Sequence, residues 1–185
     1  MNFDMPISTA AHVVISLIAI VSGAVVCYGF LAAKRLDLWT AVFLATTVLT
    51  SVTGFIFFPI ERFTPGIGIG IISLIFLAIA ILARYHYHLA GRWRAAYVIS
   101  SVIALYFNVF VLVVQLFQKV SVLKALAPTQ SEPPFAVTQI IVLIAFIVIA
   151  IAGTKRFRVE PTSPTNRAVA STGRIPNAAE SHHGG

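Results

Sequence analysis

Three amide side chains and one ammonium group interrupt the apolar run Leu105–Val120, "LYFNVFVLVVQLFQKV": Asn108, Gln115, Gln118 and Lys119. Burying an amide in hydrocarbon without a partner costs several kcal/mol. Each group must therefore meet another helix, a bound molecule or water. Amides in such positions either hold helices together or, with the ammonium group beside them, bind the polar part of a ligand.

The ligand-binding alternative gathers chemically different groups at one depth near the outer face. Gln115, Gln118 and Lys119 lie towards the end of the run, close to the level of His12 and of two outer loops. A pocket there would suit a small amphipathic molecule such as a quinone. The predicted ligand-binding residues are His12, Glu61, Arg62, Gln115, Gln118, Lys119, Gln130 and Glu132.

The helix-packing alternative rests on the spacing of small and polar residues. Ser101, Asn108 and Gln115 recur every seven positions, so they form one stripe that should face other helices rather than lipid. Interhelical hydrogen bonds in membranes contribute about 0.6 kcal/mol on average to stability, so such a face would help to hold helices together. For Asn108 packing is the favoured role, whereas for Gln115 both roles stay open, as they do for Gln118 and Lys119. The predicted packing residues are Ser16, Thr46, Thr50, Thr53, Ser101 and Asn108.

The positions of the titratable residues disfavour haem binding and catalysis. His12 lies at the outer end of the first apolar run, whereas His86 and His88 lie at the inner end of the third, about 30 Å of hydrocarbon away. No HExxH or GxSxG motif occurs, and the single cysteine, Cys27, cannot form a disulfide within the chain. We expect no enzyme activity, no metal site and no cofactor of its own, with a quinone or a haem shared with a partner left open.

The elements that position these residues are membrane-spanning helices. Of the 185 residues, 58% are hydrophobic and 10% are charged, against roughly 25% charged in soluble domains. About 20 helical residues cross the hydrocarbon layer, and the predicted spans are 7–31, 38–58, 67–83, 95–117 and 135–152. The sequence thus predicts an all-α bundle of five transmembrane helices over residues 1–158, followed by a disordered tail at 159–185.

Basic residues cluster on one side of the predicted membrane, and the segment "RYHYHLAGRWR" is typical of an interfacial belt. One side holds Lys34, Arg35, Arg84, Arg92, Arg94, Lys155, Arg156 and Arg158, and the other holds Arg62, Lys119 and Lys124. By the positive-inside rule, this imbalance of eight to three puts the N-terminus outside and the tail in the cytoplasm. The net charge of +7 is therefore an orientation signal, and we expect no nucleic-acid binding.

The segments "LATTVLTSVTGF" (Leu44–Phe55) and "FNVFVLVVQLFQKV" with "LKALAPTQSEPPF" (within Phe107–Phe135) resemble those of small multi-pass inner-membrane proteins widespread in bacteria. The resemblance covers about residues 8–153. It implies a location in the bacterial inner membrane and transfers no activity or site residue.

The sequence therefore predicts a non-catalytic integral membrane protein that is a subunit or accessory of a membrane complex. Its expected partners are the lipid bilayer and other membrane subunits or a second copy. The alternative is a binder or carrier of a small amphipathic molecule such as a quinone, held at the outer polar pocket.

Overall fold

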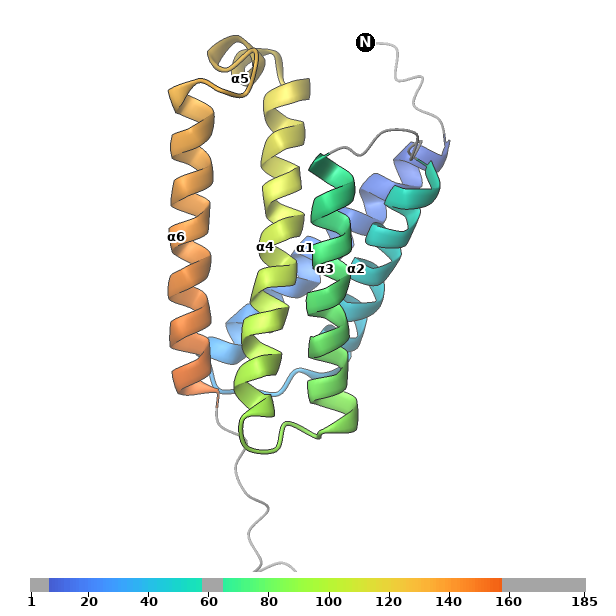
Figure 1. The fold of residues 1–185 in the computed structure, drawn as a ribbon, viewed down its shortest axis with the longest axis vertical. Helices are drawn as coiled ribbons and strands as arrows, with labels where there is room; N and C mark the ends of the chain where they lie inside the picture. Colours follow the sequence, from blue (N-terminus) through green and yellow to red (C-terminus); the bar gives the residue numbers. More distant parts are fainter. Residues whose placement is uncertain (1–6, 58–64, 158–185) are drawn as a thin grey trace, which may run out of the picture.

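The computed structural model describes residues 7–57 and 65–157, and the regular elements in those ranges are helical (Figure 1). They are α1 (Ile7–Leu31), α2 (Asp37–Phe57), α3 (Pro65–Ile81), the π-helical turn η1 (Leu82–His86), α4 (Trp93–Lys119), α5 (Ser121–Leu126) and α6 (Pro133–Arg156). Among the described residues, five helices are long and apolar enough to cross a membrane: α1, α2, α3 together with η1, α4 and α6. The predicted all-α class with five candidate spans is confirmed.

Some helix ends differ from the predicted ones because polar residues extend an apolar run. α6 continues to Arg156, past the predicted end at Ala152, and the Thr154 hydroxyl donates to the Ala150 carbonyl at 2.7 Å. Basic side chains in this last turn suit the negative end of a helix. The short α5 lies where the sequence predicts only a loop, because six residues carry little periodic signal. The predicted tail lies outside the described residues.

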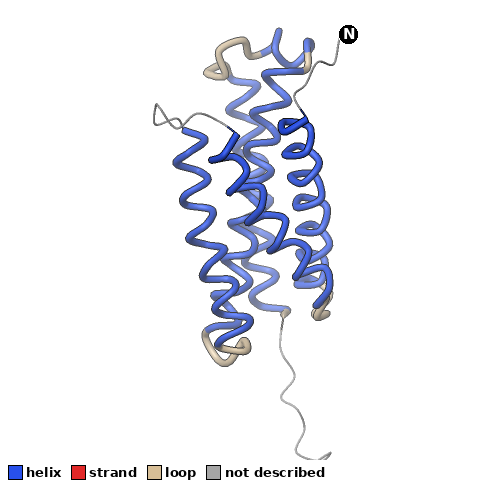
Figure 2. The backbone as a smooth tube through the Cα atoms, turned by 90° about the vertical axis from the view of Figure 1, so that its right-hand side faces the viewer, coloured by secondary structure: helices blue, strands red, loops and turns tan. Residues whose placement is uncertain are grey.

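Helix α4 is central and packs against α1, α3 and α6, while α1 lies beside α2 and crosses obliquely to reach α6 (Figures 1 and 2). One end of the bundle holds the start of α1 and α5 and is called the α5 end. The other, called the Arg84 end, holds the α1–α2 turn, η1, the turn before α4 and the end of α6. The two ends of the bundle therefore carry different turns and loops.

The hydrophobic core is concentrated towards the Arg84 end. The rings of Phe30, Tyr97 and Phe157 contact one another there, with centroids 5.2–6.2 Å apart, and join α1, α4 and the end of α6. Gly23 allows α1 to approach α4, because a Cβ at this position would lie 2.6 Å from Leu105 Cδ1. Small residues of this kind bring membrane helices close together.

The π-helical turn η1 changes the direction of side chains after α3. Its hydrogen bond joins the Tyr87 N–H to the Leu82 carbonyl at 3.0 Å, which inserts an extra residue into the turn. The chain then reverses through Leu89, which has a φ of 60°. Arg84 is turned into the bundle, whereas its neighbour Tyr85 stays exposed.

Candidate functional site

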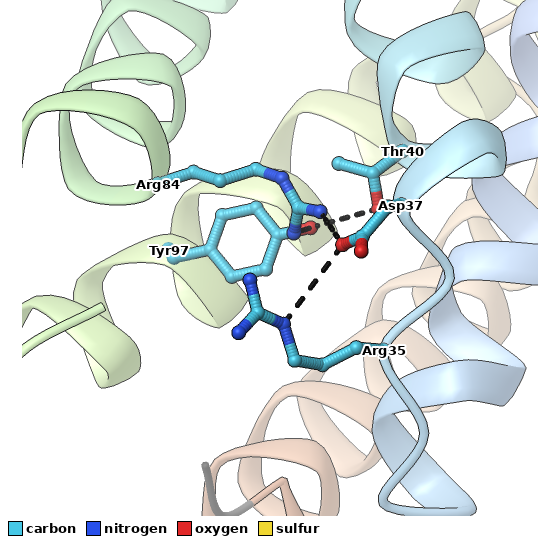
Figure 3. Close-up of polar contacts among 5 residues, drawn as sticks. All are labelled: Arg35, Asp37, Thr40, Arg84 and Tyr97. Carbon is cyan, nitrogen blue, oxygen red and sulfur yellow. Dashed lines mark hydrogen bonds and ion pairs between the residues drawn. The ribbon is translucent and has the colours of Figure 1, made fainter. Parts of the chain in front are cut away.

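An extended polar network surrounds Arg84, whose side chain is only 6% exposed although it carries a full charge (Figure 3). Nη2 of the guanidinium donates to the Asp37 carboxylate, and Nη1 donates to the Tyr97 hydroxyl at 3.2 Å. The Thr40 hydroxyl lies 3.1 Å from that of Tyr97. These four residues, here called the Arg84 network, connect α2, η1 and α4.

The directions of the hydrogen bonds follow from the guanidinium, which can only donate. The Tyr97 hydroxyl accepts from Arg84 and can therefore give its own proton to Thr40 Oγ1. The guanidinium carbon also lies 5.3 Å from the ring centroid of Tyr97 and 5.7 Å from that of Tyr85, so both rings stabilise the cation. Asp37, with a side chain 70% exposed, also lies 3.8 Å from Nε of Arg35.

The network forms because three elements begin or end at the same level. Asp37 is the first residue of α2, where a negative charge suits a helix N-terminus. Arg84 is placed by the π-helical turn, and Tyr97 lies near the start of α4. The sequence prediction missed this site because it assigned Arg84 to an interfacial belt. A signal was present, since Asp37 is an acidic residue directly bordering a predicted span on the basic side.

The predicted ligand-binding residues that the structure describes are divided between two places. His12 of α1 contacts Thr53 of α2, with 2.9 Å between Nδ1 and Oγ1, and Thr53 donates to the Leu49 carbonyl. The Thr53 proton is thus used, so His12 Nδ1 is the donor. Gln130 instead donates to the Val114 carbonyl of α4 at 3.3 Å. Figure 1 shows the start of α1 and α5 on opposite sides of the bundle.

Three further residues of that prediction lie together at the end of α4. Gln115, Gln118 and Lys119 are exposed on the last turns of α4. Long polar side chains at this level can reach water or lipid headgroups. Glu61 and Arg62 lie outside the described residues.

Glu132 fastens the loop that precedes α6. Its carboxylate accepts the backbone N–H of Thr129 at 3.1 Å and that of Ser131 at 3.0 Å, and the Thr129 hydroxyl at 2.9 Å. Desolvation acts to raise the pKa of Glu132, but these hydrogen bonds outweigh it and hold the pKa below its usual value. The ionised carboxylate therefore has a structural use in this loop.

Two of the predicted packing residues bond to another helix. Asn108 Nδ2 of α4 donates to Thr47 Oγ1 of α2 at 3.4 Å, longer than the usual range of about 2.7–3.2 Å. Thr53 accepts from His12, as described above. Thr47 is fully buried, so the Asn108 contact lies inside the bundle.

The other predicted packing residues bond within their own helix or have no described partner. Ser16 and Thr46 donate to the carbonyls four residues earlier, at 2.7 Å in each case. The hydroxyls of Thr50 and Ser101 are buried without a hydrogen-bond partner among the described residues. These side chains fit between helices because they are small, in keeping with the way membrane helices pack.

The sequence prediction also missed Gln139, a buried amide in α6. Its Nε2 donates to the Phe110 carbonyl of α4 at 3.3 Å, one helical turn from the Val114 carbonyl that Gln130 contacts. Gln139 Oε1 is buried without a partner among the described residues. The signal for this contact was an isolated amide in an apolar run, the same signal that drew attention to Asn108.

Within residues 7–57 and 65–157, no group of three His, Cys, Asp or Glu side chains could hold a metal ion. Cys27 is a buried free thiol in the core, and His86 and His88 are exposed at the Arg84 end. Comparison of the chain with protein-family models, with curated proteins and with solved structures finds no match.

Proposed function

We propose that this protein is a non-catalytic integral membrane protein that serves as a subunit or accessory of a larger membrane complex. The observation that carries the proposal is the exposure of α6. Of its 24 residues, Gln139 and Gly153 are buried, whereas α4 buries nine of its 27. A span held along so narrow a strip leaves most of its circumference for other helices or lipid.

The outward side of α6 forms a continuous aliphatic ridge. At 100° per residue, its most exposed branched side chains fall within about 100° of the helix circumference. They are Val137, Ile140, Ile141, Ile144, Val148 and Ile151, each more than half exposed. Such a ridge suits packing against a helix of another membrane subunit or of a second copy.

The main polar contacts support a structural rather than a chemical role. The Arg84 network joins three elements, Asn108 joins α4 to α2, and Gln139 joins α6 to α4. In each case the polar group is engaged by another part of the same chain. These contacts give the bundle a defined shape for presenting the ridge of α6.

The proposed setting is the bacterial inner membrane, with the N-terminus outside and the Arg84 end in the cytoplasm. The resemblance noted from the sequence supports the membrane, and the distribution of charge supports the orientation. The described basic residues at the Arg84 end are Lys34, Arg35, Arg84, Arg92, Arg94, Lys155 and Arg156, whereas the α5 end has Lys119 and Lys124.

Site-specific photocrosslinking tests the proposal. A photoreactive residue at Ile144 on the ridge, activated in native membranes, should give a protein adduct of one defined mass. Ile75 on α3 is a matched control because both side chains are 55% exposed. An adduct that forms at Ile144 and not at Ile75 supports a partner on α6. Lipid adducts alone at both positions would contradict it.

The alternative function, a carrier of a quinone-like molecule at the α5 end, receives less support. It needs His12 and the end of α4 to act together. His12 contacts Thr53 of α2, whereas Gln130 contacts the Val114 carbonyl of α4. We therefore do not propose it as the function.

A further inference from the structure

A groove of about 460 Å³ lies between α4 and α6, two of the candidate spans. This volume is within the roughly 300–1,000 Å³ typical of small-ligand sites. Its walls are almost entirely apolar and include Val102 and Ile103 of α4 and Leu143 and Ile147 of α6. The rings of Tyr106 and Phe146 meet edge to face inside it, with centroids 5.7 Å apart.

The groove is about as long as one membrane leaflet is deep. Along α6 its lining extends from Leu143 to Lys155, which is about 18 Å at 1.5 Å per residue. Half of the hydrocarbon core measures about 15 Å. Because Lys155 lies at the Arg84 end, the groove extends from the headgroup level there to about the middle of the bilayer. This shape suits a single lipid chain.

The headgroup end of the groove is basic. Lys155 lines it, and the adjacent Arg156 is exposed. Arg94 of α4 donates from Nη1 to the Phe157 carbonyl at 2.9 Å, which holds it beside the end of α6 with further N–H donors left over. Asp37, the acidic residue in the described part of this end, is already paired within the Arg84 network.

From this combination we propose that the α4–α6 groove binds an acidic phospholipid of the leaflet at the Arg84 end. One acyl chain lies along the apolar walls, and Lys155 holds the phosphate, with Arg94 and Arg156 beside it. A zwitterionic lipid carries a cationic group in addition to its phosphate. That group would lie among these basic residues, and repulsion between like charges would weaken binding. The proposal concerns a lipid and does not depend on the proposed partner of α6.

The test uses the purified full chain in nanodiscs that contain phosphatidylcholine and phosphatidylglycerol with identical acyl chains. Native mass spectrometry counts the molecules of each lipid that stay bound when the protein is released from the nanodisc. Lys155→Gln should retain phosphatidylglycerol about five-fold less well, the effect typical of one basic residue at a membrane surface, and phosphatidylcholine unchanged. Lys34→Gln is the matched control, since it removes the same charge at the same end outside the groove lining.

A second pair of variants tests the walls. Ala150→Phe fills the groove and should lower the retention of both lipids. Ala45→Phe fills an apolar groove of about 540 Å³ between α2 and α3, whose lining includes no basic residue, and should change neither. Melting temperatures show which variants are folded, and Lys155→Gln should be, because that side chain is exposed.

Three results would overturn the proposal. Equal losses of phosphatidylglycerol retention in Lys155→Gln and Lys34→Gln would show a general effect of charge. Unchanged retention by a folded Ala150→Phe variant would place the lipid elsewhere. The protein could instead retain a neutral isoprenoid lipid and lose it in Tyr106→Phe. That result would mean that the ligand is recognised by Tyr106 at the deep end of the groove and not by Lys155.

Discussion

At the residue scale, the two partners of the Arg84–Asp37 ion pair have unequal surroundings. The Arg84 side chain is 6% exposed and that of Asp37 is 70% exposed. Asp37→Ala leaves a buried cation without its carboxylate. It should lower the free energy of unfolding by about 2–3 kcal/mol, less than the roughly 3–5 kcal/mol of a fully buried pair. Arg84→Met leaves a carboxylate that water can solvate, so it should cost about 1 kcal/mol or less.

Equilibrium unfolding in mild detergent measures this asymmetry. The double variant Asp37→Ala with Arg84→Met should be more stable than Asp37→Ala alone, because it no longer holds an unpaired buried charge. Equal costs for the two single variants would mean that the buried cation is not the source of the effect.

The loop bound by Glu132 should respond to pH. Because the folded-state pKa is lowered, the contribution of the carboxylate is complete above the pKa that it has in the unfolded chain. It is lost as the pH falls through the lowered folded-state value. Glu132→Gln should therefore speed hydrogen exchange at the amides of Thr129 and Ser131 at neutral pH, and the ratio to wild type should shrink in acid. A ratio independent of pH would show that the ionised carboxylate is not what protects these amides.

At the scale of elements, the crossing of α1 over α4 depends on Gly23. A Cβ there would lie 2.6 Å from Leu105 Cδ1 and 2.8 Å from Phe43 Cε2, both buried side chains. Gly23→Ala should therefore destabilise the bundle by about 1–3 kcal/mol through overpacking. Gly54→Ala is the control, since its nearest contact would be His12 Cε1 at an ordinary 3.6 Å, and it should be nearly neutral. Thermal melting of both variants checks the difference, and equal melting temperatures would refute the close crossing.

The elements were more predictable than the contacts between them. Apolar runs alone indicate five spans, because hydrophobic length is a local property. The sequence predicts a packing role for Asn108, and its side chain contacts Thr47 of α2. The lateral order of the helices is not readable, so the contact of His12 with Thr53 of α2 could not be predicted. The Arg84 network was missed for a related reason, since it needs a π-helical turn that periodicity does not show.

At the scale of the whole molecule, the imbalance of basic residues makes the orientation testable. A reporter that is active only in the cytoplasm should be active when fused after Arg158 and silent when inserted within Thr129–Glu132, because basic loops stay in the cytoplasm. A reporter active only outside the cytoplasm, inserted at the same positions, should give the reverse pattern. The opposite pair of results would invert the proposed orientation.

The contact of Phe30 with Gly153 and Phe157 joins the first described helix to the last. The ribosome makes Phe30 long before either of these residues, so this part of the core cannot close until the end of α6 has been made. Until α6 leaves the translocon, the Phe30 ring has only the chain already inserted and lipid around it. The packing of α6 against Phe30 of α1 is therefore a late step, which follows the insertion of both helices.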